Sequence, residues 1–147
     1  MLGEYERAVA ELQGVLGGIS DPEFEALRAP DSADEDCRSL QTIVAHVVRS
    51  GYGYANSIRT AFAAEITSPD LGIPSRTTSI DQLGAVLRYT EATLQGRWSM
   101  TDEDLMAVRV TTRRGPICDL EQMLEHAIVH VLRHRRQVQG MLRPRSS

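Results

Sequence analysis

The stretch DLEQMLEHAIVHVLRHRRQ, residues 119–137, carries the clearest helical pattern in the chain. Asp119 followed by Gln122 forms a capping-box pattern, which marks the start of a helix. The apolar side chains that follow recur every three or four positions, as on one face of an amphipathic helix; they are Leu120, Met123, Leu124, Ala127, Ile128, Val131 and Val138. Such a helix needs other elements against which this face can pack.

The same periodicity predicts three more helices upstream. The first covers residues 5–19 and ends at a pair of glycines. The second is long and runs from about residue 36 to 65. The third begins at Ser79, whose spacing to Gln82 repeats the capping-box pattern, and it extends to Trp98.

Shorter features are predicted between these helices. Asp21 and Pro22 open a short helical turn at most, because Asp is a good N-cap and Pro suits the first helical position. An acidic loop follows at residues 31–36, and a loop rich in Pro, Ser and Gly covers residues 67–78. Residues 106–116 alternate valines with polar side chains, which predicts a short extended segment or hairpin arm.

Four amphipathic helices of this length predict an all-α protein, an antiparallel four-helix bundle. The length of 147 residues corresponds to a single domain over residues 1–147. In a simple up-and-down bundle the second and fourth helices run parallel to each other. These two helices carry all the histidines of the chain.

The composition is that of an ordinary globular protein. Its net charge of -4 argues against general binding to nucleic acid or to an anionic membrane. The chain has no signal-peptide pattern and no apolar run long enough to span a bilayer, so we expect it to be cytoplasmic. Cys37 and Cys118 are expected to be reduced thiols at one common end of the bundle, away from the histidines.

The four histidines predict a metal site. His126, His130 and His134 recur every four residues, so they project to one side of their helix, near the core and outside its charged face. His46 lies on the flank of the apolar stripe of the second helix, beside Ser50. A metal site usually needs at least three protein ligands, and two parallel helices would place His46 and His130 at similar heights. Hydrogen-bonded core or surface histidines without a metal remain the alternative.

Two motifs resemble those of a known family. The segments TIVAH (42–46) and HAIVHVLRHRRQ (126–137) resemble the histidine motifs of the DinB-like superfamily of four-helix bundles, which includes thiol-dependent transferases and isomerases. This resemblance implies that His46, His130 and His134 are the metal ligands. It also implies a divalent ion, commonly zinc or nickel, and a homodimer.

The resemblance makes His126 a neighbour of the metal ligands. The chain departs from the family at Arg136, which stands where the terminal motif usually has a glycine. Because the helix phase points Arg136 to solvent, we expect the three ligands to be unaffected.

Three imidazoles leave a coordination position open, where a thiol or a water molecule would become more acidic. The resemblance places transfer of a low-molecular-weight thiol to a small-molecule substrate first. A metal-dependent hydrolase and a non-catalytic, metal-binding dimer are the alternatives. His126, Arg133, Gln137 and Ser50 are candidates for supporting the ligands or contacting a substrate.

Overall fold

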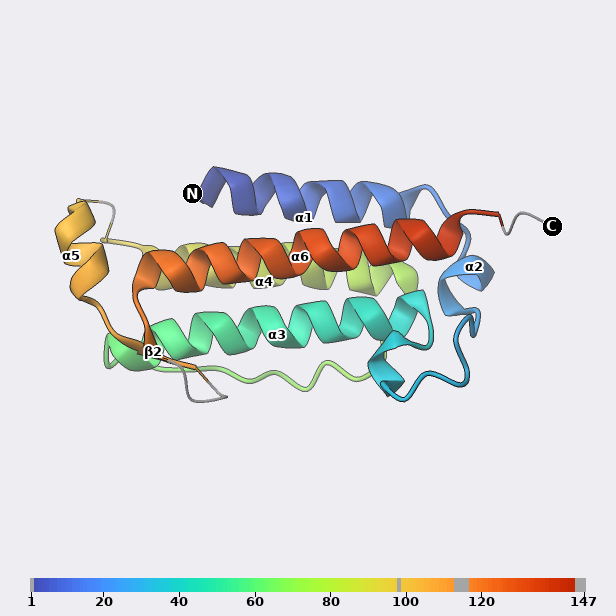
Figure 1. The fold of residues 1–147 in the computed structure, drawn as a ribbon, viewed down its shortest axis with the longest axis horizontal. Helices are drawn as coiled ribbons and strands as arrows, with labels where there is room; N and C mark the ends of the chain where they lie inside the picture. Colours follow the sequence, from blue (N-terminus) through green and yellow to red (C-terminus); the bar gives the residue numbers. More distant parts are fainter. Residues whose placement is uncertain (1, 98, 113–116, 145–147) are drawn as a thin grey trace.

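Four long helices pack side by side in the computed structural model, which describes residues 2–97, 99–112 and 117–144 (Figure 1). They are α1 (Leu2–Gly17), α3 (Leu40–Ala61), α4 (Arg76–Leu94) and α6 (Leu120–Leu142). The shorter elements are α2 (Asp21–Glu25), the 3-10 helix η1 (Glu35–Cys37), α5 (Asp102–Ala107) and the strands β1 (Val110–Thr111) and β2 (Ile117–Cys118). The predicted all-α four-helix bundle is confirmed. No helix of the described residues is long and apolar enough to cross a membrane.

The direction of the helices differs from the simple up-and-down order. Figure 1 shows α1 and α6 running one way and α3 and α4 running the other, so that α3 is antiparallel to α6. The predicted parallel arrangement of these two helices is therefore wrong. Its cause is the connection of residues 62–75, which runs back along the bundle before α4 begins. Extended chain of this length reaches about 46 Å, whereas α3 is only about 33 Å long.

Local capping decides where the helices begin. Asp119 caps α6 and pairs with Gln122 in a capping box, as predicted. The predicted start of the second helix at residue 36 is early, because Ser39 caps α3 and η1 precedes it. The predicted start of the third helix at Ser79 is one turn late: Ser75 accepts a hydrogen bond from the backbone of the residue three positions on and caps α4.

The shorter predicted features are confirmed in part. The helical turn at Asp21 and Pro22 is α2, but Ser20 caps its start in a capping box with Glu23, so Asp21 is not the N-cap as predicted. Within the segment predicted as extended, only β1 is a strand; it pairs antiparallel with β2, which lies just beyond that segment, and Met106 belongs to α5. Residues 113–116 and Trp98 lie outside the described residues.

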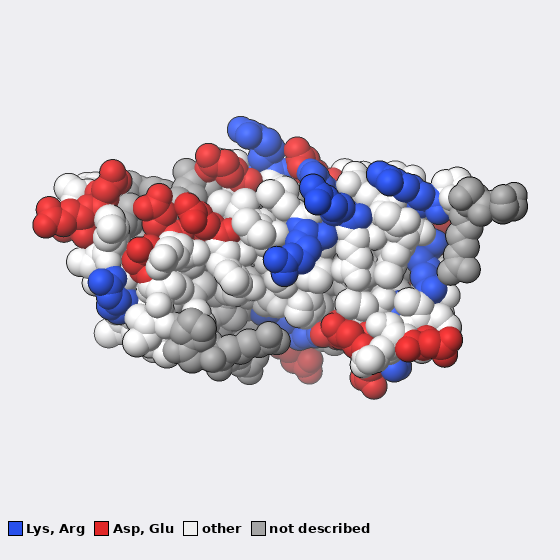
Figure 2. Space-filling model, in the orientation of Figure 1, with Lys and Arg blue, Asp and Glu red and all other residues white. Residues whose placement is uncertain are grey.

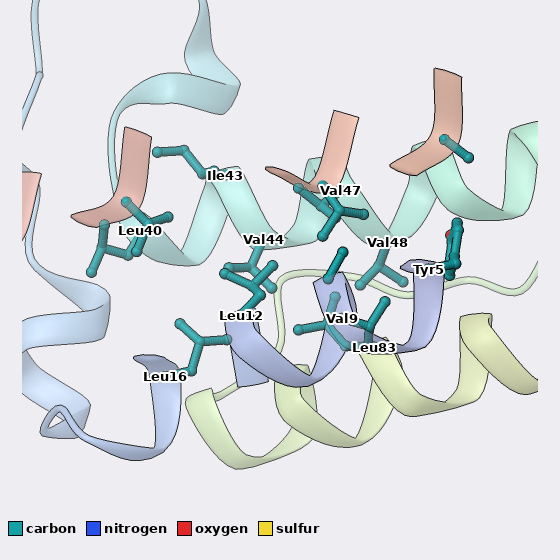
Figure 3. Packing of buried hydrophobic residues seen from close by; sticks show 14 of the residues in the cluster. Tyr5, Val9, Leu12, Leu16, Leu40, Ile43, Val44, Val47, Val48 and Leu83 are labelled. Atoms are coloured by element: carbon teal, nitrogen blue, oxygen red, sulfur yellow. The ribbon is translucent and has the colours of Figure 1, made fainter. Parts of the chain in front are cut away.

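The main hydrophobic core is shared by all four long helices. Figure 3 shows side chains of α1, α3 and α4 meeting in it, and Ala127 and Val131 of α6 belong to the same cluster. Phe24 of α2 is fully buried and closes one end of this core. A second cluster, which includes Ile58, Leu94 and Leu120, fills the other end of the bundle. The core thus holds α3 against α6 from both ends.

A glycine allows α3 and α4 to approach closely. A β-carbon added at Gly51 would lie 2.8 Å from Cγ2 of Val86 and 3.4 Å from the hydroxyl of Tyr5. Gly53, two residues along the same helix, has nothing within 4 Å of the equivalent position. The two glycines therefore have different roles in one helix.

We expect Gly51→Ala to lower the free energy of unfolding by about 1–3 kcal/mol, because the added methyl group overpacks the contact with Val86. Gly53→Ala is the matched control and should raise this free energy by about 0.5–1 kcal/mol, since alanine favours a helix over glycine. Chemical denaturation followed by circular dichroism measures both. A Gly51→Ala protein as stable as the Gly53→Ala protein would contradict the close packing.

Candidate metal centre

Three histidine rings bring one nitrogen each to a common point between α3 and α6. Nε2 of His130 lies 3.1 Å from Nε2 of His46 and 3.2 Å from Nε2 of His134. All three are half-buried, and one ring nitrogen of each lies within 4.8 Å of those of the others. Among the described residues, these three histidines form the one group of potential metal ligands that lie close enough together to hold an ion.

The helices place these rings by spacing and by direction. His130 and His134 stand one turn apart in α6, with ring centroids separated by 4.5 Å. His46 lies six residues, about 9 Å, from the start of α3, and His134 lies eight residues, about 12 Å, from the end of α6. Because the helices are antiparallel, these two ends lie together (Figure 1). The predicted meeting of the three histidines therefore occurs, but through the opposite helix direction.

Oxygen atoms hold the outer nitrogens of two of the rings. Nδ1 of His46 lies 3.3 Å from Oδ2 of Asp36, and Nδ1 of His134 lies 2.8 Å from Oε1 of Gln137. Both oxygens are acceptors, so each ring carries its proton on Nδ1 and presents the lone pair of Nε2 to the centre. Histidines that ligate metals usually have such a partner on the other nitrogen.

The donor set fits a divalent ion. A proton on Nε2 of His130 can be donated to only one of its two neighbours, so two lone pairs still face each other, which is unfavourable without a cation. Three imidazole nitrogens at 2.0–2.1 Å from a tetrahedral ion lie about 3.3 Å apart. The observed separations of 3.1 and 3.2 Å are close to that value.

The protein favours the neutral form of two of these rings, those of His130 and His46. Burial lowers the pKa of His130 to about 3, and the nearby His134 and His46 act in the same direction. Burial also lowers the pKa of His46, as does His134, whereas the carboxylate of Asp36 opposes this shift. Neutral imidazole is the form that binds a metal. These two lone pairs are therefore available at neutral pH without loss of a proton.

The other predicted site residues lie around this centre. His126 is exposed and packs against the ring of Tyr54, with centroids 5.6 Å apart, so its predicted place near the core is wrong. Each step of four residues advances about 40° around a helix, and two steps carry His126 out of line with His134. Arg136 is exposed, as predicted, and Ser50 is half-buried one turn after His46.

A shallow hollow opens beside His130 on the outer side of α6. It has a volume of about 260 Å³, and its lining comprises Gln122, Glu125, His126, Val129, His130 and Arg133. Figure 2 shows basic side chains over the C-terminal half of α6 and acidic side chains below them, around η1. The viewed face is thus mixed in charge and carries no continuous basic surface.

The two cysteines lie at opposite ends of the bundle. Cys37 precedes α3 and Cys118 precedes α6, and because these helices are antiparallel the predicted common end is wrong. The thiol of Cys37 donates to Oδ2 of Asp34 at 3.5 Å. Burial raises the pKa of Cys118, whose thiol faces the backbone oxygen of Val110. Neither thiol belongs to the three-histidine group.

Sequence reasoning missed Asp36 as a partner of His46. The only signal was its position at the end of an acidic segment just before the second helix. Periodicity cannot show this contact, because it depends on the path of η1 ahead of α3.

Comparisons with known proteins agree with this architecture. Residues 4–138 match a family model described as the DinB superfamily. The crystal structure of the mycothiol-dependent maleylpyruvate isomerase has a TM-score of 0.60 and 19% identity, over 93% of this chain and 58% of that chain. A histidine-to-alanine mutant of that enzyme matches with the same TM-score and coverage and 18% identity. At such identity the likeness shows the fold, and this chain spans little more than half of that enzyme. No curated protein matches in sequence.

Protein purified without an affinity tag should contain about one divalent ion per chain, as measured by elemental analysis. We expect His130→Ala to abolish this content, because Nε2 of His130 contacts both other rings. His126→Ala, one turn earlier and exposed, should retain it and serves as the matched control. Full metal content in His130→Ala would refute the three-histidine site.

Proposed function

Because this chain belongs to the DinB superfamily and carries a three-histidine cluster, we propose that it is a divalent-metal-dependent enzyme that transfers a low-molecular-weight thiol to a small molecule. The observation that carries this proposal is the convergence of three imidazole nitrogens beside an open hollow. The structurally similar isomerase is described as mycothiol-dependent, which supports a thiol as co-substrate.

His46, His130 and His134 would hold the ion. Imidazole donors suit zinc and nickel alike, so the donor set is compatible with both. Once bound, such an ion supplies Lewis-acid chemistry that makes a thiol or a water molecule more acidic. Three protein donors leave room for one more ligand in a tetrahedral site. Asp36 and Gln137 keep the ring protons on the outer nitrogens, so the inner nitrogens stay free to bind.

The hollow beside His130 is where we place the small-molecule substrate. Arg133 lines it and offers a guanidinium group to an anionic part of the substrate. Val129, which is 50% exposed, offers an apolar wall in the same hollow. Arg133 lies three residues after His130 and one residue before His134, so an anion bound to Arg133 would lie close to the candidate metal centre.

Two other functions use the same geometry. A hydrolase would activate water at the same three histidines. A non-catalytic, metal-binding homodimer would cover exposed apolar side chains of α6, for which Val129 and the 37% exposed Leu132 are candidates. We propose a homodimer in either case, in line with the family motifs of the chain. The experiments below separate these alternatives.

The metal-loaded protein should consume a small thiol in the presence of an electrophilic acceptor. We expect His130→Ala to lose this activity and Arg136→Ala to keep it, because Arg136 is exposed on α6 and belongs neither to the three-histidine group nor to the lining of the hollow. Loss of free thiol, followed with a chromogenic disulfide, measures the reaction across a panel of thiols and acceptors. Metal-dependent ester or amide cleavage without thiol would favour the hydrolase, and no turnover across the panel would favour the non-catalytic protein.

Arg133→Ala should raise KM for acceptors that carry a carboxylate by about tenfold or more, since a charge-assisted hydrogen bond contributes about 1.5–3 kcal/mol. Neutral acceptors should be little affected. Arg136→Ala is the matched control, because Arg136 is also exposed on α6 but does not line the hollow. If Arg133→Ala and Arg136→Ala raise KM equally, the cause is the lost positive charge of the surface and not a contact between Arg133 and the substrate.

A further inference from the structure

We propose that Asp36 is the residue that positions His46 for metal binding and that Arg49 holds Asp36 in place, an inference that rests on the proposed metal site. Asp36 lies in η1, and both of its carboxylate oxygens contact side chains of α3. Oδ2 lies 3.3 Å from Nδ1 of His46, and Oδ1 accepts a hydrogen bond from Nη2 of Arg49 at 3.0 Å. Each oxygen thus has its own partner.

The backbone of Asp36 is also fixed. Its N–H donates to Oδ1 of Asp34 at 3.0 Å, and its carbonyl oxygen accepts from the hydroxyl of Thr42 at 3.0 Å. Thr42 belongs to the first turn of α3 and takes part in the capping box with Ser39. The 3-10 turn is therefore tied to the helix that carries His46. This leaves the carboxylate little freedom to move away from the ring.

The position of this carboxylate decides which nitrogen of His46 is free. An acceptor beside Nδ1 keeps the proton there, so the lone pair of Nε2 points to Nε2 of His130, 3.1 Å away. Without Asp36 the ring could turn or carry its proton on Nε2, and each change would remove a donor from the centre. Partners of this kind typically contribute 10- to 100-fold to metal affinity.

The contact between Arg49 and Asp36 orients the carboxylate of Asp36 more than it stabilises the fold. The side chains of Asp36 and Arg49 are 39% and 46% exposed, and ion pairs at such exposure contribute little to folding. Arg49 lies nearly one turn after His46 on α3, so it can hold Oδ1 while Oδ2 faces the ring. Its removal should therefore disturb the metal site without unfolding the protein.

The residues that contact Nδ1 of His134 and of His46 come from different parts of the chain. Gln137 lies three residues after His134 in the same helix, so this contact forms whenever α6 forms. Asp36 comes from a separate segment, so the orientation of His46 depends on the docking of η1 onto α3. The position of η1 is thereby part of the metal site.

The test is the affinity for zinc, measured by competition with a chromophoric chelator. We expect Asp36→Ala to weaken binding by about 10- to 100-fold. Asp36→Asn, which keeps an acceptor oxygen, should recover part of this loss, and Arg49→Ala should weaken binding less than Asp36→Ala. Glu35→Ala is the matched control. Glu35 precedes Asp36 in the same 3-10 turn and its side chain is 85% exposed, so this substitution should leave the zinc affinity within about twofold.

A second measurement follows the ring directly in the metal-free protein. The nitrogen chemical shifts of His46 should report a proton on Nδ1 in the wild type and a mixture of tautomers in Asp36→Ala, while thermal unfolding changes little. Unaltered zinc affinity and tautomer in Asp36→Ala would overturn the proposal, as would an equal loss in Glu35→Ala. If the wild type binds no zinc, the proposed function fails, whereas the tautomer measurement still decides the role of Asp36.

Discussion

The packing of α3 against α6 is the constraint on which the candidate metal centre depends. α6 supplies two ring nitrogens one turn apart, and only the antiparallel approach of α3 adds the third. Side chains of both helices, such as Val47 and Val131, belong to one buried cluster. Burial of that apolar surface offsets the cost of leaving three half-buried polar rings beside it. The hydrophobic core, assembled from all four helices, therefore sets the distance between the metal-binding groups.

The sequence predicts those parts of the molecule that local rules control. The cap at Asp119 and the contact between His130 and His134 depend on one helix alone, and both are found as predicted. The direction of α3 relative to α6 depends on the path of residues 62–75, which no periodicity encodes. His46 was still expected opposite His130, because His130 lies near the middle of α6, where reversing the helix direction changes its height little. Asp36 was missed since its contact is set by the turn before α3.

Family membership accounts for the fold of this chain, whereas its chemistry depends on the residues of the site. The match over residues 4–138 accounts for the bundle, and a shared fold alone does not assign a reaction. The case for metal chemistry comes from the state of the histidines: burial favours the neutral form of His130 and His46, and oxygen acceptors lie beside the outer nitrogens of His46 and His134. Two of the three candidate ligands can therefore receive a divalent cation without first releasing a proton. Hydrogen-bonding geometry, as well as the presence of histidine, therefore supports metal binding at this site.

The separation of the three candidate ligands along the chain has a consequence for how an ion would be acquired. His46 and His130 are 84 residues apart. Closing a loop of that length in an unfolded chain costs about 4 kcal/mol in entropy, apart from a constant term. In the unfolded chain an ion would find only the local pair of α6, and two imidazoles bind weakly. The third donor becomes available after the helices have docked, so the folded topology creates the candidate site, and an ion bound there would be captured late in folding.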